Sequence, residues 1–82
     1  MHEEVNQPVE VVTLYEKHRA RPLYFRWNGR WIKITRINMI HHVCEGDRRI
    51  FFFSVSNEAA AYRLRFEPDV LKWHLEEIYV EE

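Results

Sequence analysis

The strongest structural signal in this 82-residue sequence is the stretch LYFRWNGRWIKI, residues 23–34. Its central dipeptide, Asn28-Gly29, is typical of a two-residue β-hairpin turn, because a type I′ turn needs positive φ at both positions. The sequence therefore predicts two antiparallel strands, 23–27 and 30–37, joined by this turn.

The two-residue turn also predicts the register of the hairpin. If Trp27 pairs with Arg30, alternate side chains point to opposite faces of the two strands. One face is apolar and is predicted to cover the core: Leu23, Phe25, Ile32 and Ile34. The other face is aromatic and cationic: Tyr24, Arg26, Trp31 and Lys33.

Outside the hairpin, β-rich runs separated by turn residues predict further strands. These runs are residues 9–15, 49–56 and 61–66. Residues 37–43 continue or bend the strand that follows the hairpin turn. Turns are expected at 45–47, where Gly46 can take positive φ, and at 57–59.

The segment 70–80 fits two patterns. Three apolar residues alternate as in a strand: Leu71, Trp73 and Leu75. The alternative is a helical stripe behind an Asp69 cap, formed by Leu71, Leu75, Ile78 and Tyr79. We favour the strand, which needs a bulge near Glu76 and Glu77 to keep the following isoleucine inward.

These elements predict an all-β fold: about six antiparallel strands, a meander built on the Asn-Gly hairpin, in a strongly bent sheet or small barrel. A length of 82 residues suits one domain, 1–82, with residues 1–7 as a flexible N-terminus. Hydrophobic residues make up 46% and charged residues 30%, which is ordinary for a globular chain that folds.

The same sequence features indicate a compartment. A lone cysteine, Cys44, cannot form an internal disulfide and favours a reducing environment. The first ten residues are polar and acidic and do not resemble a secretory signal. The longest strongly apolar run, 50–53, is far shorter than the ~20 residues that span a bilayer. We expect a cytoplasmic protein with no membrane partner.

Charge is distributed unevenly, although the net charge is only −1. Between residues 17 and 49, nine basic side chains stand against two acidic ones, a local excess of +7, and both flanks are acidic. Such asymmetry can mark an anion-binding face. The alternative is that acidic strands lie beside basic ones and neutralise them across the sheet.

The sequence shows no complete catalytic or metal-binding motif. The run His41-His42-x-Cys44 contains zinc-ligand types, but a structural zinc site needs four ligands. No serine lies in a nucleophile elbow, and two isolated glycines cannot form a phosphate-binding loop. We predict no catalytic residue, no metal and no cofactor.

The aromatic and cationic hairpin face is the best candidate for binding. Aromatic platforms beside cations hold single-stranded nucleic acid by stacking and phosphate attraction. Alternatively, Arg26 and Trp31 form a cross-strand cation–π pair, or another strand covers Trp31. The candidate binding residues are Tyr24, Arg26, Arg30, Trp31, Lys33 and Arg36.

A longer pattern is Pro22…Phe25-x-Trp27-x-Gly29-Arg30…Phe51-Phe52-Phe53…Tyr62-Arg63-Leu64…Trp73-x-Leu75-x-x-Ile78-Tyr79. It resembles a small bacterial β domain that stands alone or at the C-terminus of inactive Y-family DNA polymerase-like proteins of damage tolerance. The chain departs from that pattern at residues 38–42, where those domains tend to have a charged segment with a tryptophan. The resemblance implies a final strand, an association with DNA and no catalytic residues.

We therefore expect a non-enzymatic binding or accessory module. Its expected partner is single-stranded nucleic acid or a nucleic-acid-processing protein. The alternative is a protein–protein adaptor or homodimer that uses exposed aromatic residues and an open sheet edge.

Overall fold

The turn at Asn28 and Gly29 forms as predicted. The computed structural model describes residues 1–80, and φ is 53° at Asn28 and 74° at Gly29. Positive φ at both positions is the requirement of a type I′ turn. Trp27 pairs with Arg30, and the next three pairs along the hairpin also match the prediction. The predicted register is therefore confirmed.

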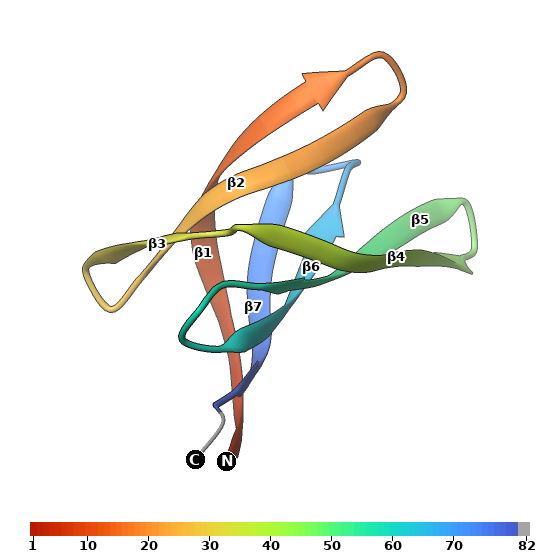
Figure 1. Cartoon of the computed structure of the whole chain (residues 1–82). Helices are drawn as coiled ribbons and strands as arrows, with labels where there is room; N and C mark the ends of the chain where they lie inside the picture. Colours follow the sequence, from red (N-terminus) through yellow and green to blue (C-terminus); the bar gives the residue numbers. More distant parts are fainter. Residues whose placement is uncertain (81–82) are drawn as a thin grey trace.

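Within residues 1–80, seven antiparallel strands form one sheet that does not close into a barrel (Figure 1). The strands are β1 (His2–Glu16), β2 (Arg19–Trp27), β3 (Arg30–Lys33), β4 (Arg36–Glu45), β5 (Arg48–Ser56), β6 (Ala61–Glu67) and β7 (Lys72–Tyr79). Their spatial order is β3-β2-β1-β7-β6-β5-β4, so the first and last strands are neighbours. The all-β, antiparallel, single-domain character is confirmed. In the same described part of the chain, no helix is long and apolar enough to cross a membrane.

The strand predicted over 30–37 is divided into two, which raises the number of strands. The backbone N–H of Ile34 still donates to the carbonyl of Leu23 in β2, at 2.9 Å. The next N–H, that of Thr35, donates to the carbonyl of Ser56 in β5, at 3.0 Å. The chain thus leaves one edge of the sheet and joins the opposite edge within one residue.

The first strand begins earlier than the predicted start at Val9. Residues 1–7 were expected to form a flexible N-terminus, but β1 starts at His2 and pairs with β7 from His2 to Val9. Backbone pairing needs no apolar side chain, so this polar segment carries no alternating pattern that would reveal a strand. The second half of β1 then pairs with β2.

The concave side of the bent sheet holds the core. The predicted inward alternation of Tyr62, Leu64 and Phe66 in β6 is confirmed. Phe25 of the hairpin is fully buried and meets the ring of Tyr62 edge-on, with ring centroids 5.0 Å apart. The buried cluster is Phe25, Ile34, Phe53, Val55, Tyr62, Leu64, Phe66, Trp73, Leu75 and Ile78.

Three neighbouring strands change register at the same level of the sheet. β7 carries an extra residue, Glu76, relative to β6, so that Leu75 and Ile78 both face the core. This is the predicted bulge, and the last segment is a strand. At the same level β1 also shifts its register against β7, with φ at 48° for Asn6. Bulges bend a strand and increase its twist, so these irregularities curl the sheet here.

Side chains also fasten the start of β1 to the end of β7. His2 Nε2 donates to Glu77 Oε1 at 2.8 Å, and the His2 ring stacks on Tyr79 with centroids 4.6 Å apart. The hydrogen bond from His2 is the main reason that the pKa of Glu77 lies below its ordinary value of 4.5.

This contact predicts a pH-dependent contribution to stability. Because the folded-state pKa of Glu77 is lowered, its contribution is present above about pH 4.5 and is lost as the pH falls through the lowered value. Glu77→Gln should therefore lower the free energy of unfolding by up to about 1 kcal/mol at pH 6. The two proteins should converge near pH 3.

Urea denaturation at the two pH values measures this difference, with the exposed Glu58→Gln as the matched control. A Glu77→Gln effect that is equally large at both pH values would contradict the assignment.

Candidate nucleic-acid interface

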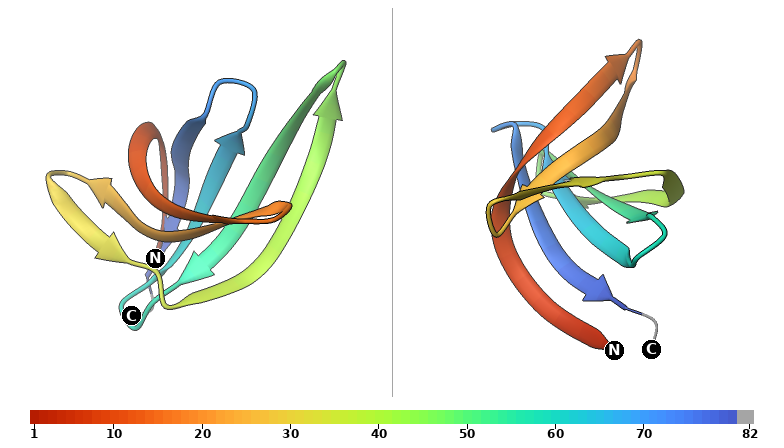
Figure 2. Two further views of the ribbon diagram at one scale, coloured as in Figure 1. Left: turned by 90° about the horizontal axis from the view of Figure 1, so that it is seen from above. Right: turned by 60° about the vertical axis from the view of Figure 1, so that its left-hand side comes forward.

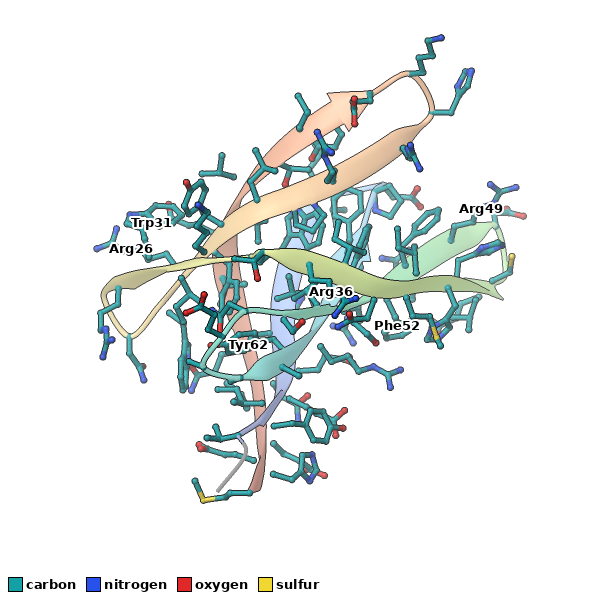
Figure 3. All side chains as sticks on the ribbon, in the orientation of Figure 1. Arg26, Trp31, Arg36, Arg49, Phe52 and Tyr62 are labelled. Atoms are coloured by element: carbon teal, nitrogen blue, oxygen red, sulfur yellow. The ribbon has the colours of Figure 1, made fainter. Side chains whose placement is uncertain are left out.

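The hairpin presents its aromatic and cationic face to solvent. Tyr24 is 39% exposed and Trp31 is 52% exposed, so neither ring is covered by another strand. Tyr24 pairs with Lys33, and Arg26 pairs with Trp31. Figure 3 shows Arg26 and Trp31 together at the hairpin. Four of the six predicted binding residues therefore share one accessible face.

Arg26 interacts with β1 as well as lying opposite Trp31. Its Nη1 is 3.5 Å from Oε1 of Glu10, the residue beside it in the sheet. Both side chains are at least half exposed, so this ion pair is worth about 1 kcal/mol or less. Arg26 can therefore exchange the carboxylate for another anion at small cost.

The other two predicted residues, Arg30 and Arg36, lie apart from this face. Strand alternation points Arg30 to the side of the hairpin opposite Trp31. Arg36 begins β4, opposite Ser56, after the chain has crossed to the other edge of the sheet (Figure 3). Both side chains are exposed. The sequence alone could not show this separation, because it depends on the break after β3.

The basic segment 17–49 is neutralised only in part. Three of its nine basic residues have a carboxylate nearby: Arg21 beside Glu16, Arg26 beside Glu10 and Arg48 beside Glu67. Across residues 1–80, the other six have no ion-pair partner: Lys17, Arg19, Arg30, Lys33, Arg36 and Arg49. Neutralisation across the sheet therefore reaches three of the nine basic residues.

The arginines of β6 are different, because the sheet already pairs them. Glu76 Oε1 lies 3.2 Å from Nε of Arg63, and its Oε2 lies 3.8 Å from Nη1 of Arg65. The Arg63 guanidinium also lies over the ring of Phe52, 4.8 Å from its centroid, and His41 stacks on that ring from β4. This outer surface of β5–β7 is a self-contained charge network and offers few cations to a ligand.

The residues of the His-His-x-Cys run do not come together. His41 stacks on Phe52 on the outer face, whereas His42 lies against Phe51, its partner in β5. Cys44 is exposed near the tip of the β4–β5 hairpin. No group of three or more His, Cys, Asp or Glu side chains that could hold a metal occurs in the described part of the chain.

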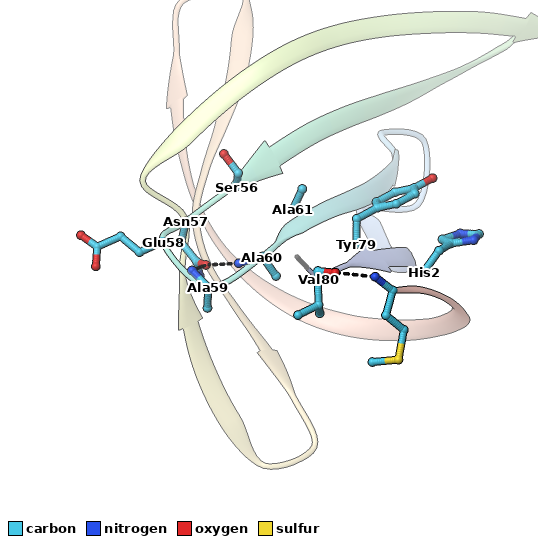
Figure 4. A pocket seen from close by; sticks show the side chains of 10 residues that line it. His2, Ser56, Asn57, Glu58, Ala59, Ala60, Ala61, Tyr79 and Val80 are labelled. Carbon is cyan, nitrogen blue, oxygen red and sulfur yellow. Dashed lines mark hydrogen bonds between the residues drawn. The ribbon is translucent and has the colours of Figure 1, made fainter. Parts of the chain in front are cut away.

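A cavity of about 480 Å³ lies where β7 ends beside the β5–β6 turn (Figure 4). Several of its polar groups are already bonded: Asn57 Oδ1 accepts from the N–H groups of Ala59 and Ala60, and the amine of Met1 donates to the Val80 carbonyl. Much of the remaining lining is alanine, which carries no reactive group.

A second cavity, of about 320 Å³, opens between the β1–β2 and β4–β5 hairpins. Its lining is mostly apolar: Tyr15, Ala20, Ile40, Phe51, Phe53, Phe66, Pro68 and Leu71, with Lys17, His18 and Arg19 beside them. Leu71 is 71% exposed and has a φ of 54°, a conformation that costs a leucine about 1–2 kcal/mol. Sequence reasoning missed this site because its residues come from separate strands and turns.

Comparison with known proteins identifies no relative of this chain. No family model, no curated protein and no solved structure matches it. The resemblance to the polymerase-associated β domain therefore stays an expectation from the sequence.

Truncating an aromatic side chain should change the free energy of unfolding little on the outer face of the β2–β3 hairpin and much on its core face. Trp31→Ala should change the free energy of unfolding by less than about 1 kcal/mol, because half of the residue is already solvated. Phe25→Ala should lower it by about 3–5 kcal/mol, because it leaves a cavity in the core. Urea denaturation followed by circular dichroism measures both. A loss for Trp31→Ala as large as that for Phe25→Ala would show that Trp31 is a core residue.

Proposed function

We propose that this chain is a non-enzymatic accessory module that binds single-stranded nucleic acid on the outer face of the β2–β3 hairpin. The observation that carries the proposal is the exposure of two aromatic rings, Tyr24 and Trp31, on the face that also holds Arg26 and Lys33. A core role would bury both rings.

The spacing of the two rings suits stacking. Tyr24 lies opposite Lys33, and Trp31 lies opposite Arg26, so the two aromatic residues occupy diagonal positions on neighbouring strands. Diagonal neighbours on one face of a sheet are about 7–8 Å apart. Two platforms at this separation can each take one base of a flexible single strand. Because every base has a π-face, such binding depends little on sequence.

The cations supply attraction to phosphate. Lys33 has no ion-pair partner among residues 1–80, and the contact between Arg26 and Glu10 is solvated and weak. Arg30 lies on the other side of the hairpin and is not among these contacts. Phosphates bound by Arg26 and Lys33 would release the counterions of the nucleic acid, so affinity should fall as salt rises.

An amide chemical-shift titration with a short oligothymidylate tests the proposal. Shifts should concentrate in residues 24–33 at low salt and weaken at moderate salt. Trp31→Ala should reduce affinity at least about fivefold, because one stacked base is worth about 1–3 kcal/mol. Trp31→Phe is the matched control, since it keeps a ring and should keep most of the affinity.

Two outcomes would contradict the proposal. The first is an absence of shifts in residues 24–33 at low salt. The second is broadening of the same residues with protein concentration alone, which would indicate a homodimer that uses this face.

A further inference from the structure

β4 is a long open edge of the sheet. From Met39 to Glu45 it makes seven consecutive regular pairs with β5, and in the described chain no strand pairs with its other side. Natural proteins blunt such edges with lysine, proline or a bulge. Here the bulge is confined to the start of the strand, between Ile37 and Met39. Residues 39–45 contain no lysine, arginine or proline.

Because the sheet does not close into a barrel, an opening remains between its two edges. β4 forms one side of this opening, and β2 forms the other. β3 pairs with β2 from Tyr24 to Trp27, and Ile34 bonds to Leu23, so residues 19–22 of β2 extend beyond this pairing. From the crossing at Ile34 and Thr35, the β1–β2 and β4–β5 hairpins diverge (Figure 2). Pro22 lacks an N–H and lies in this part of β2, which makes β2 a poor edge for pairing. β4 is therefore the side that can accept another strand.

The cavity of about 320 Å³ lies between these two hairpins. Ile40 of β4 lines it on one side, and Tyr15 and Ala20 of the β1–β2 hairpin line it on the other. Leu71 completes the lining from the β6–β7 turn, with an exposed apolar side chain on a left-handed backbone. A strand added to β4 would direct alternate side chains toward this apolar surface.

Basic residues predominate around the opening, although Glu45 lies at the end of β4 and Asp47 in the turn that follows. Lys17 and Arg19 belong to the lining of the cavity, and Arg36 and Arg49 lie at the two ends of the β4–β5 pair. None of the four has an ion-pair partner within residues 1–80, and the lining includes no acidic residue. This charge is complementary to an acidic partner. A second copy of the chain would bring two positive openings together, which disfavours it.

We propose that the β4 edge binds an extended peptide of alternating apolar and acidic residues from another protein. The peptide pairs its backbone with residues 39–45, places its apolar side chains in the cavity, and directs its carboxylates to the cations around the opening. This is strand addition to a sheet edge, in which backbone hydrogen bonds give affinity and alternate side chains give specificity. The site is separate from the outer face of the hairpin and does not depend on nucleic-acid binding.

A fluorescent peptide of alternating leucine and aspartate is the probe, and anisotropy with the whole chain measures its binding. The peptide should bind at least about tenfold more tightly than one of alternating leucine and lysine. The same leucine–aspartate peptide with alternate backbone nitrogens methylated should lose most of its affinity, because it cannot pair with β4. Amide shifts should appear in residues 39–45.

Leu71→Gly separates binding from stability. Glycine accepts a φ of 54° without strain, so the variant should be at least as stable as the parent and should bind the peptide about fivefold more weakly. Val70→Ala is the matched control, because Val70 is also exposed but does not line the cavity. Its affinity should be unchanged. Arg19→Glu should weaken binding about tenfold.

Four outcomes would overturn the proposal. These are no saturable binding of the leucine–aspartate peptide, equal binding of the leucine–lysine peptide, displacement of the peptide by oligothymidylate, and a dimer in sedimentation whose contacts include residues 39–45. The third outcome would make the opening a nucleic-acid site, and the fourth would make a second copy its occupant.

Discussion

The shape of this molecule depends on register shifts that fall at one level of three neighbouring strands. β7 has an extra residue at Glu76, β6 is displaced against it, and β1 changes register near Asn6. Regular strand pairing gives a sheet an even twist, and bulges add local bending to it. With them, β1, β7 and β6 bend together. Leu75 and Ile78 both turn inward, and the sheet curls around one core.

The curl nearly brings the two edges of the sheet together. The two sides are joined where the chain crosses between them. There the N–H of Ile34 donates to the Leu23 carbonyl of β2, and the N–H of Thr35 donates to the Ser56 carbonyl of β5. Beyond that point the β1–β2 and β4–β5 hairpins diverge, so the sheet stays open on one side. The same bend therefore accounts for both surfaces of interest: the outer face of the β2–β3 hairpin, with Tyr24 and Trp31, and the opening beside β4.

The sequence predicts the parts of this structure that local chemistry controls. Asn28 and Gly29 determine the hairpin register, and alternation in β6 predicts which residues are buried. The bulge at Glu76 follows from the need to keep apolar residues inward. The first half of β1 could not be predicted, because pairing with β7 joins residues more than 60 positions apart. The exposed face of Tyr24, Arg26, Trp31 and Lys33 follows from register alone, since it lies within one hairpin.

The opening beside β4 was beyond sequence reasoning for a different reason. Its lining combines residues from β1, β2, β4, β5, β6 and two turns, and each apolar residue taken alone fits an ordinary core position. Arg30 and Arg36 show the same limit. They are near the hairpin face in sequence, but strand alternation and the crossing to the other edge move them away from it.

The sheet is open along β4, and amide hydrogen exchange of the free protein is the measurement that examines this edge residue by residue. In an edge strand, only alternate N–H groups bond to the neighbouring strand. Within residues 39–45, protected amides should therefore alternate with amides that exchange rapidly, while β6 and β7 are protected throughout. Uniform protection across residues 39–45 would show that another strand already covers this edge and that the sheet is not open there.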